Sequence, residues 1–168
     1  MSFDYTLNLA DSLKNMAKRG AFLTVKDNDG KVNTMTIGWG NVGYEWGRPV
    51  FTVLVRESRY TYKLLENAED FTVSIPFDDK MNEALKFCGS KSGRDFDKFK
   101  ECNLTMLDGK LVKSPAIGDC QMIYECKIVY KNPMDFKLLD EDVKDKWYKS
   151  DDRHIIYYGE IMNCYNLW

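Results

Sequence analysis

Short apolar segments rich in β-branched residues recur along the whole chain with turn signals between them, and this series restricts the fold more than any other feature. The expected strands are residues 21–27, 31–39, 49–55, 71–76, 104–107, 110–113, 119–131 and 154–165. Asn28-Asp29-Gly30, between the first two strands, is a strong hairpin signal. A series of this length predicts a mainly β fold that closes, or nearly closes, into a barrel.

Helical insertions interrupt the strands. The expected helices are residues 5–18, 58–68 and 79–101, the third of them broken at residues 89–93, and residues 140–149 form a short helix or a loop. Ser58 is the expected N-cap of the second helix. Residues 40–48 hold three glycines and are expected to form a loop. The 168 residues show no linker and no repeat, so we expect a single domain over residues 1–168.

The composition excludes several classes of site and partner. His154 is the only histidine, so a metal site with two histidines is impossible, and we expect no metal. A net charge of −2 argues against nucleic acid as a partner, and no segment approaches the ~18 apolar residues of a membrane helix. The five cysteines form no CxxC pair and are expected to be reduced, mostly buried thiols of a cytoplasmic protein. His154 itself is either a structural residue or a catalytic one.

One glycine motif matches a dinucleotide-binding fingerprint but lacks its context. Gly38-Trp39-Gly40-Asn41-Val42-Gly43 fits the pattern GxGxxG. That pattern binds a pyrophosphate only where it opens a helix, and the following residues 44–49 do not begin one. We therefore interpret the motif as a glycine-rich turn after a strand.

Two segments carry groups that can bind an anion. Arg56, Ser58, Arg59 and Thr61 stand where an apolar strand gives way to a helix, and hydroxyl groups and guanidinium groups beside a helix start can hold a phosphate. The alternative is a helix cap with two solvated arginines. The glycine-flanked loop of residues 88–95, with its lysine and two serines, can likewise wrap an anion or simply connect two helices.

The expected strand at residues 31–39 has two different faces. Thr34 and Thr36 share one face, and Met35 and Ile37 share the other. A row of threonines that ends in a glycine and a tryptophan can flank a flat ring rich in heteroatoms. The alternative is an ordinary half-exposed strand.

Together these segments resemble the flavin reductase-like family of FMN-binding split barrels, and most of all its flavoredoxin-type branch. The matching segments are residues 33–40 (NTMTIGWG), 49–76, 88–99 (CGSKSGRDFDKF) and 152–161 (DRHIIYYGEI). They follow the order of the family and cover most of residues 20–165. The most specific part is CGSKSGRDFDKF together with the Ser-Arg-x-Thr pattern of residues 58–61.

The resemblance implies an antiparallel split β-barrel that forms a homodimer, with FMN near the subunit interface. It implies that the FMN phosphate is held by Arg56, Ser58, Arg59 and Thr61, with Lys91 and Ser92 reaching the phosphate or the ribityl chain. It implies that the isoalloxazine ring is lined by Thr34, Met35, Thr36, Ile37, Gly38 and Trp39, and that His154 lies near the flavin.

Two functions follow from the resemblance. The first is an NAD(P)H-dependent flavin reductase or an FMN-mediated electron-transfer enzyme, in which NADH or NADPH donates a hydride. The second is a non-catalytic FMN carrier that takes electrons from a redox protein. A ligand-binding barrel without flavin and a thiol-redox protein are further alternatives, and the scattered cysteines argue against the latter. Because a flavin carries out the redox chemistry itself, few catalytic side chains are needed.

Overall fold

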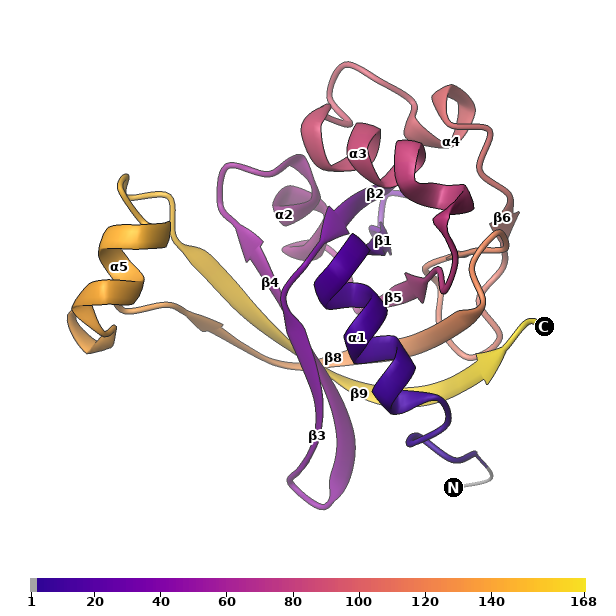
Figure 1. Cartoon of the computed structure of the whole chain (residues 1–168), viewed down its shortest axis with the longest axis horizontal. Helices are drawn as coiled ribbons and strands as arrows, with labels where there is room; N and C mark the ends of the chain where they lie inside the picture. The colour runs from indigo at the N-terminus through magenta and orange to yellow at the C-terminus, as the bar shows by residue number, and fades with distance from the viewer. Residues whose placement is uncertain (1–2) are drawn as a thin grey trace.

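The computed structural model describes residues 3–168, and seven of its strands form one sheet in the order β2-β1-β5-β8-β9-β4-β3 (Figure 1). These strands are β1 (Ala21–Lys26), β2 (Val32–Ile37), β3 (Gly40–Glu45), β4 (Arg48–Arg56), β5 (Asp70–Ile75), β8 (Met122–Pro133) and β9 (His154–Asn166). Two short strands, β6 (Met106–Leu107) and β7 (Ala116–Ile117), pair with each other. All neighbours in the large sheet are antiparallel.

The large sheet curls until its two edges approach each other. β2 forms one edge of the sheet, and it contacts β4, which lies next to the other edge. The seven strands therefore make an antiparallel split β-barrel with helical insertions, which confirms the fold class predicted from the sequence.

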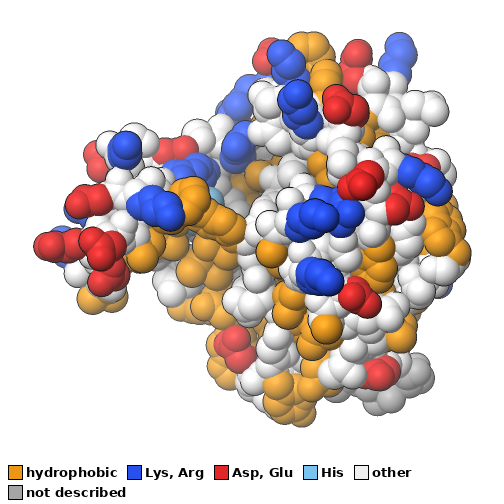
Figure 2. Space-filling view, viewed as in Figure 1, with side chains coloured by type: hydrophobic (Ala, Val, Ile, Leu, Met, Phe, Trp, Pro, Cys, Tyr) orange, Lys and Arg blue, Asp and Glu red, His pale blue; other side chains and the backbone are white. Residues whose placement is uncertain are grey.

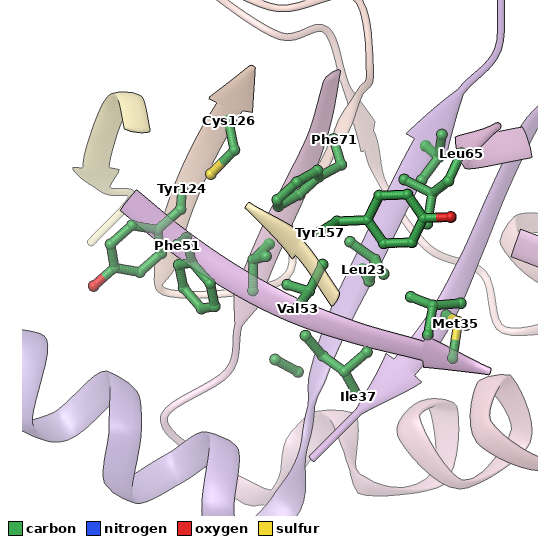
Figure 3. Packing of buried hydrophobic residues seen from close by; sticks show 14 of the residues in the cluster. Leu23, Met35, Ile37, Phe51, Val53, Leu65, Phe71, Tyr124, Cys126 and Tyr157 are labelled. Atoms are coloured by element: carbon green, nitrogen blue, oxygen red, sulfur yellow. The ribbon is translucent and has the colours of Figure 1, made fainter. Parts of the chain in front are cut away.

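Large side chains that point inward from the strands fill the barrel. Figure 3 shows the rings of Phe51, Phe71, Tyr124 and Tyr157 in this core. The rings of Phe51 and Tyr124 meet edge to face, with their centres 5.1 Å apart. Gly159 on β9 leaves room for a ring, because a Cβ at this position would lie 2.5 Å from Cζ of Phe71. This close packing fixes the course of β9, the strand that begins at His154.

Five helices accompany the barrel, and all but the last of them lie against its outside or one of its ends. They are α1 (Leu9–Arg19), α2 (Tyr60–Leu65), α3 (Asn82–Ser90), α4 (Lys98–Glu101) and α5 (Glu141–Trp147), with 3₁₀ turns η1 (Asp79–Met81) and η2 (Phe136–Leu138). α3 lies against β2 and β1, and its Leu85 and Cys88 pack with Phe22 of β1 in a second buried cluster. Within residues 3–168, no helix is both long enough and apolar enough to cross a membrane.

α5 stands apart from the body of the molecule at the far ends of β8 and β9 (Figure 1). We call residues 134–153, which join these two strands, the α5 arm. The arm contains the charged segment that the sequence predicts as a short helix or a loop, and the helix is formed. Asp140 caps it by accepting hydrogen bonds from the backbone N–H groups of Asp142 and Val143.

The prediction of a loop at residues 40–48 is wrong, because most of this segment is the strand β3, which pairs with β4. Its two-residue turn is Trp46-Gly47, with φ angles of 52° and 73°. Positive φ at both positions is typical of a type I′ hairpin turn, whose twist suits two paired strands. The glycines of the GxGxxG match therefore lie before and within an edge strand, and no helix follows them.

Further differences from the expectation concern one strand and the starts of two helices. Residues 110–113 form no strand, because the backbone N–H groups of Lys110 and Leu111 donate to the buried carboxylate of Glu125 instead of to a neighbouring strand. α1 begins at Leu9 and not at residue 5, after Asn8 in a left-handed conformation. The N-cap of α2 is Arg59, and the expected cap Ser58 hydrogen-bonds elsewhere.

Candidate functional site

Two adjoining hollows lie where β2, β4, the loop after α3 and the α5 arm meet. One, of about 240 Å³, we call the aromatic hollow; it is lined by Met35, Thr36, Ile37, Gly38, Trp39, Leu54, Arg56, Arg59, Trp147 and His154. The other, of about 200 Å³, we call the cationic hollow; it is lined by Asn33, Met35, Arg56, Ser58, Arg59, Tyr60, Thr61, Ser90, Lys91, Ser92, Gly93, Arg94, Lys98 and Asp152. Figure 2 shows the surface hollowed between the arm and the body, with Lys and Arg side chains along its upper edge.

The sequence-predicted site residues gather in these two hollows, with one exception. Met35, Arg56 and Arg59 line both hollows, so the two hollows adjoin each other. The residues come from distant parts of the chain: β2, the β4–α2 junction, the loop after α3 and the start of β9. A larger hollow, of about 570 Å³, lies beside α3 and contains none of the predicted residues.

The exception is Thr34, which lines neither hollow. Its side chain is fully buried, and its hydroxyl donates to the backbone oxygen of Leu23. Thr36 lines the aromatic hollow, but its hydroxyl is also engaged and donates to the oxygen of Leu85 on α3 at 2.6 Å. The hydroxyl of Thr34 is thus bonded to β1 and that of Thr36 to α3, so a ring in the aromatic hollow would meet the β2 backbone and Met35 instead of a row of free threonine hydroxyls.

Arg56 connects β4 to the α5 arm. Its guanidinium donates to the backbone oxygens of Asp152 and Trp147, at 2.5 and 2.8 Å. The same guanidinium lies 4.9 Å from the centre of the Tyr148 ring. Two N–H groups of Arg56 therefore hold the arm in place, and the arm brings Trp147 into the aromatic hollow.

Ser58 and Thr61 are also tied to neighbouring side chains. Ser58 donates through both its backbone N–H and its hydroxyl to the carboxylate of Asp152, at 3.1 and 2.6 Å. The side-chain amide of Asn33 donates to the hydroxyl of Thr61 at 2.8 Å, which joins β2 to α2. These bonds build the wall of the cationic hollow.

His154 is a neutral imidazole at the side of the aromatic hollow. Burial lowers its pKa to about 4, and the positive charge of Arg56 contributes in the same direction. Its Nδ1 lies 2.7 Å from the hydroxyl of Tyr148, whose pKa is raised by burial. The direction of this hydrogen bond depends on the imidazole tautomer. In the tautomer in which the phenol donates to Nδ1, the imidazole proton is on Nε2, and His154 offers this N–H as a donor.

Two tryptophans form the mouth of the aromatic hollow. The rings of Trp39 and Trp147 meet edge to face with centres 4.8 Å apart, and the Trp39 ring lies 5.4 Å from that of His154. Both tryptophans remain partly exposed, at 38% and 45%. The sequence predicts Trp39 as a site residue but not Asn33, Lys98 or Trp147. Asn33 and Lys98 lie within the matching segments 33–40 and 88–99, whereas no local pattern marks Trp147.

Comparison with known proteins places this geometry among related folds. The model of the family described as Flavin reductase like domain matches residues 13–166. A protein of Archaeoglobus fulgidus is 32% identical over 99 residues, which are 59% of this chain and 55% of that protein. A protein of Pyrococcus abyssi is 24% identical over 107 residues, 64% of this chain and 60% of that protein. The chain thus aligns with less than two thirds of each of these relatives.

Several solved structures share the fold at low sequence identity. Flavoredoxin of Desulfovibrio vulgaris (Miyazaki F) has a TM-score of 0.67 at 24% identity, over 88% of this chain and 68% of that chain. The FMN-binding protein from Thermus thermophilus has a TM-score of 0.67 at 20% identity, over 88% and 70%. The NADH:FAD oxidoreductase of Streptomyces globisporus C-1027 has a TM-score of 0.65 at 18% identity, over 89% and 76%. The family match runs through both hollows and nearly the whole barrel, and the chain belongs to the flavin reductase like family.

Proposed function

We propose that this chain is an FMN-binding oxidoreductase that takes electrons from NADH or NADPH and passes them to a flavin or to another acceptor. The observation that carries the proposal is a cluster of cations that form no salt bridge within residues 3–168 and that line a hollow adjoining an aromatic one. Family membership and the neighbouring folds support it. In the same proposal, residues 1–168 are one domain, and the five free cysteines, four of them buried, fit a reducing cytoplasm.

The cationic hollow fits the phosphate of FMN. Its cations form no salt bridge within residues 3–168; they are Arg56, Arg59, Lys91, Arg94 and Lys98. Asp152 is the one acidic lining residue, and its carboxylate is already bonded to Ser58. Cations gathered without counter-charges repel one another, so a bound phosphate stabilises the cluster.

The aromatic hollow fits the isoalloxazine ring. β2 is an edge strand, so one side of its backbone has N–H and C=O groups free for the heteroatoms of a flat ring. Met35 and Leu54 offer apolar contact, and Trp39 stands at the mouth. When bound, FMN supplies the hydride-accepting and electron-transfer chemistry.

The residues of the chain would bind FMN, position it and shield it from solvent. Arg59, Lys91 and Ser92 would bind the phosphate, while Arg56 holds the α5 arm. We propose that His154 acts through its Nε2–H as a hydrogen-bond donor toward the ring. A neutral donor of this kind can stabilise negative charge without releasing a proton.

An anaerobic titration tests the electron donor. We expect the purified protein with FMN to lose its yellow absorption band when NADH or NADPH is added, because the partly exposed mouth of the aromatic hollow leaves room for a nicotinamide. Stopped-flow absorbance measures the rate for each nucleotide. If dithionite bleaches the band and neither nucleotide does, the protein is an FMN carrier that serves a redox protein.

We also propose that the protein is a homodimer. Trp46, Tyr130 and Tyr158 form an aromatic patch on the outside of β3, β8 and β9, with ring centres 5.2 to 5.9 Å apart. Trp46 and Tyr130 are 58% and 47% exposed. Clustered exposed rings are typical of a protein interface, and a second copy of this chain is the occupant that we propose.

Removing the patch is expected to separate the subunits. The double variant Trp46→Ser, Tyr130→Ser should weaken dimerisation at least ~10-fold, since buried aromatic residues dominate interface energies. Size-exclusion chromatography with light scattering measures the mass as a function of concentration. Leu111→Ser, which removes an equally exposed apolar side chain outside the patch, is the control. A monomeric wild-type protein would contradict the proposal.

A further inference from the structure

Two thiols meet beside the larger hollow, away from the aromatic and cationic hollows. Cys88 belongs to α3, and Cys102 directly follows α4, on the same side of the barrel (Figure 1). Cys102 packs against the second buried cluster, of which Cys88 is a member, and the two thiol groups are in hydrogen-bond contact. Two thiols in contact can be joined by a disulfide with only small shifts of the backbone.

Cys102 is the accessible member of the pair. It is half-buried, whereas Cys88 is 1% exposed, and the remaining cysteines, Cys120, Cys126 and Cys164, are buried. Cys102 lines the hollow of about 570 Å³ beside α3, which we call the thiol hollow, and Cys88 does not. This volume is typical of small-molecule sites. A small molecule can therefore reach Cys102 directly, and Cys88 only through Cys102.

The lining of the thiol hollow is partly apolar and partly charged. Met81 and Phe87 belong to its apolar part, and Lys86 and Glu101 carry opposite charges. Within residues 3–168 neither Lys86 nor Glu101 forms a salt bridge. A peptide-like disulfide carries amino and carboxylate groups that can pair with such charges. The chemistry of the hollow therefore fits a small peptide disulfide as the reagent that meets Cys102.

We infer that Cys102 and Cys88 form a redox-active dithiol that a small peptide disulfide oxidises. The thiolate of Cys102 attacks one sulfur of the reagent, whose S–S bond breaks and releases one thiol. The thiolate of Cys88 then attacks Sγ of Cys102, displaces the second thiol and completes an internal disulfide. Two protein thiols are oxidised, the reagent is reduced to two thiols, and the two cysteine protons pass through solvent to the released thiols.

The surroundings of the two thiols make the reaction dependent on pH. Burial raises the pKa of Cys88 to about 12 and also raises the pKa of Cys102, to which the charge of Glu101 contributes. The ammonium of Lys98 acts in the opposite direction on both thiols. Because only a thiolate attacks a disulfide, we expect slow oxidation at pH 7 and faster oxidation as the pH rises toward 9.

The disulfide would close residues 88–102 into a ring. This segment supplies residues 90–94 and Lys98 to the lining of the cationic hollow, and Ser90 also lines the thiol hollow. Ring closure reduces the number of conformations open to the segment. Oxidation would therefore restrict one wall of the cationic hollow. In a reducing compartment such a disulfide is transient and typical of redox sensing.

Incubation of the reduced full chain, without added flavin, with oxidised glutathione at pH 8.5 tests the inference. We expect the wild-type protein to lose two of its five thiols, as counted by alkylation and mass spectrometry. A tryptic digest without reductant should contain residues 87–91 joined to residues 101–110, the peptides that hold the two cysteines. The midpoint of thermal unfolding should rise by ~5 °C or more on oxidation, because the ring restricts the unfolded chain.

Three variants separate the two steps. Cys102→Ser should form no internal disulfide. Cys88→Ala should stop after the first step, so its mass should increase by one glutathione, held at Cys102; Cys88→Ser is the second variant if Cys88→Ala does not fold. Cys164→Ser is the matched control, because Cys164 is a buried thiol outside the pair, and a serine can keep its hydrogen bond to the backbone oxygen of Asp4. This control should form the wild-type disulfide at the wild-type rate.

The inference is overturned if the folded wild-type protein keeps all five thiols under conditions that oxidise the urea-unfolded chain. A disulfide between any other two cysteines, or unchanged oxidation of folded Cys102→Ser, would also overturn it. The inference goes beyond the proposed function and does not depend on it. A protein that binds flavin but forms no internal disulfide would leave the proposed function standing, and a protein that forms the disulfide but binds no flavin would do the reverse.

Discussion

Replacing Arg59 with alanine is expected to weaken FMN binding about 100-fold and to leave riboflavin binding nearly unchanged, on the scale of two lost hydrogen bonds to a charged group. Arg59 lines both hollows, at the point where they join. One of its terminal nitrogens donates to the backbone oxygen of Gly89 at 3.0 Å, which orients the guanidinium. Within residues 3–168 its other donors have no partner, and a planar guanidinium can bind two phosphate oxygens at once.

The other residues of the predicted phosphate cradle are less available. Arg56 is engaged with two backbone oxygens of the α5 arm, and Ser58 is engaged with Asp152. Replacing Arg56 is therefore expected to loosen the arm and to reduce riboflavin and FMN binding alike. Arg59 is the position at which a phosphate-specific loss should be largest.

Isothermal titration of the wild-type protein, Arg59→Ala, Arg59→Lys and Lys63→Ala with FMN and with riboflavin measures this difference. Arg59→Lys keeps the charge without the planar fork and should show an intermediate loss. Lys63 is an exposed cation of the neighbouring α2 and serves as the control. A loss of the same size for FMN and riboflavin would show that Arg59 supports the fold of the site and does not bind the phosphate.

Most of the barrel could be predicted because most of its strands are marked by local sequence signals, such as β-branched runs and turn residues. The β-branched run of residues 49–55 is buried in the barrel, and the Asn28-Asp29-Gly30 turn joins β1 to β2. β3 could not be predicted in the same way. Its glycines suggest a loop, and its strand conformation depends on pairing with β4 and on the positive φ angles at Trp46-Gly47. Such tertiary pairing overrides local composition.

The site residues that belong to local sequence patterns could be predicted from the sequence. The segments 33–39 and 56–61 and the loop after α3 do meet in space, since β2, β4 and α3 are neighbours in the barrel. The α5 arm, which joins β8 to β9 and is held by hydrogen bonds from Arg56, places Trp147 in the aromatic hollow. No sequence pattern near residue 147 predicts this position. Thr34 and Thr36 show the converse: alternation predicts that they share a face, but only the folded structure shows that Thr34 bonds to β1 and Thr36 to α3.

The α5 arm explains how one segment can serve both hollows. Asp152 bonds to Ser58 at the cationic hollow, while Trp147 and Tyr148 stand beside His154 at the aromatic one. Glu57 and Arg153 add a salt bridge at 3.3 Å between the β4–α2 junction and the arm. Movement of the arm would therefore alter the mouth of the aromatic hollow and the wall of the cationic hollow together.

The wild-type protein is expected to lose stability in mild acid, and replacing His154 with glutamine should remove a large part of that loss. The pKa of His154 is about 4 in the folded protein, against its usual value of 6.5. Between these two values the unfolded chain binds a proton that the folded chain does not. The free energy of unfolding therefore falls as the pH drops from 6.5 to 4, by about 3 kcal/mol at most, since each pKa unit is worth about 1.4 kcal/mol.

Urea unfolding of the wild-type protein and of His154→Gln between pH 4 and 7.5 measures this effect. The chain has no other histidine, so carboxylates contribute alike to both curves and the difference belongs to His154. Tyr148→Phe is the matched control: it removes the hydrogen bond to Nδ1 but keeps a buried ring over the imidazole, and it should retain the slope below pH 6.5. Parallel curves for the wild-type protein and His154→Gln would show that folding does not lower the pKa of the imidazole. His154 would then gain a proton near pH 6.5 and could act as a neutral N–H donor only above that pH.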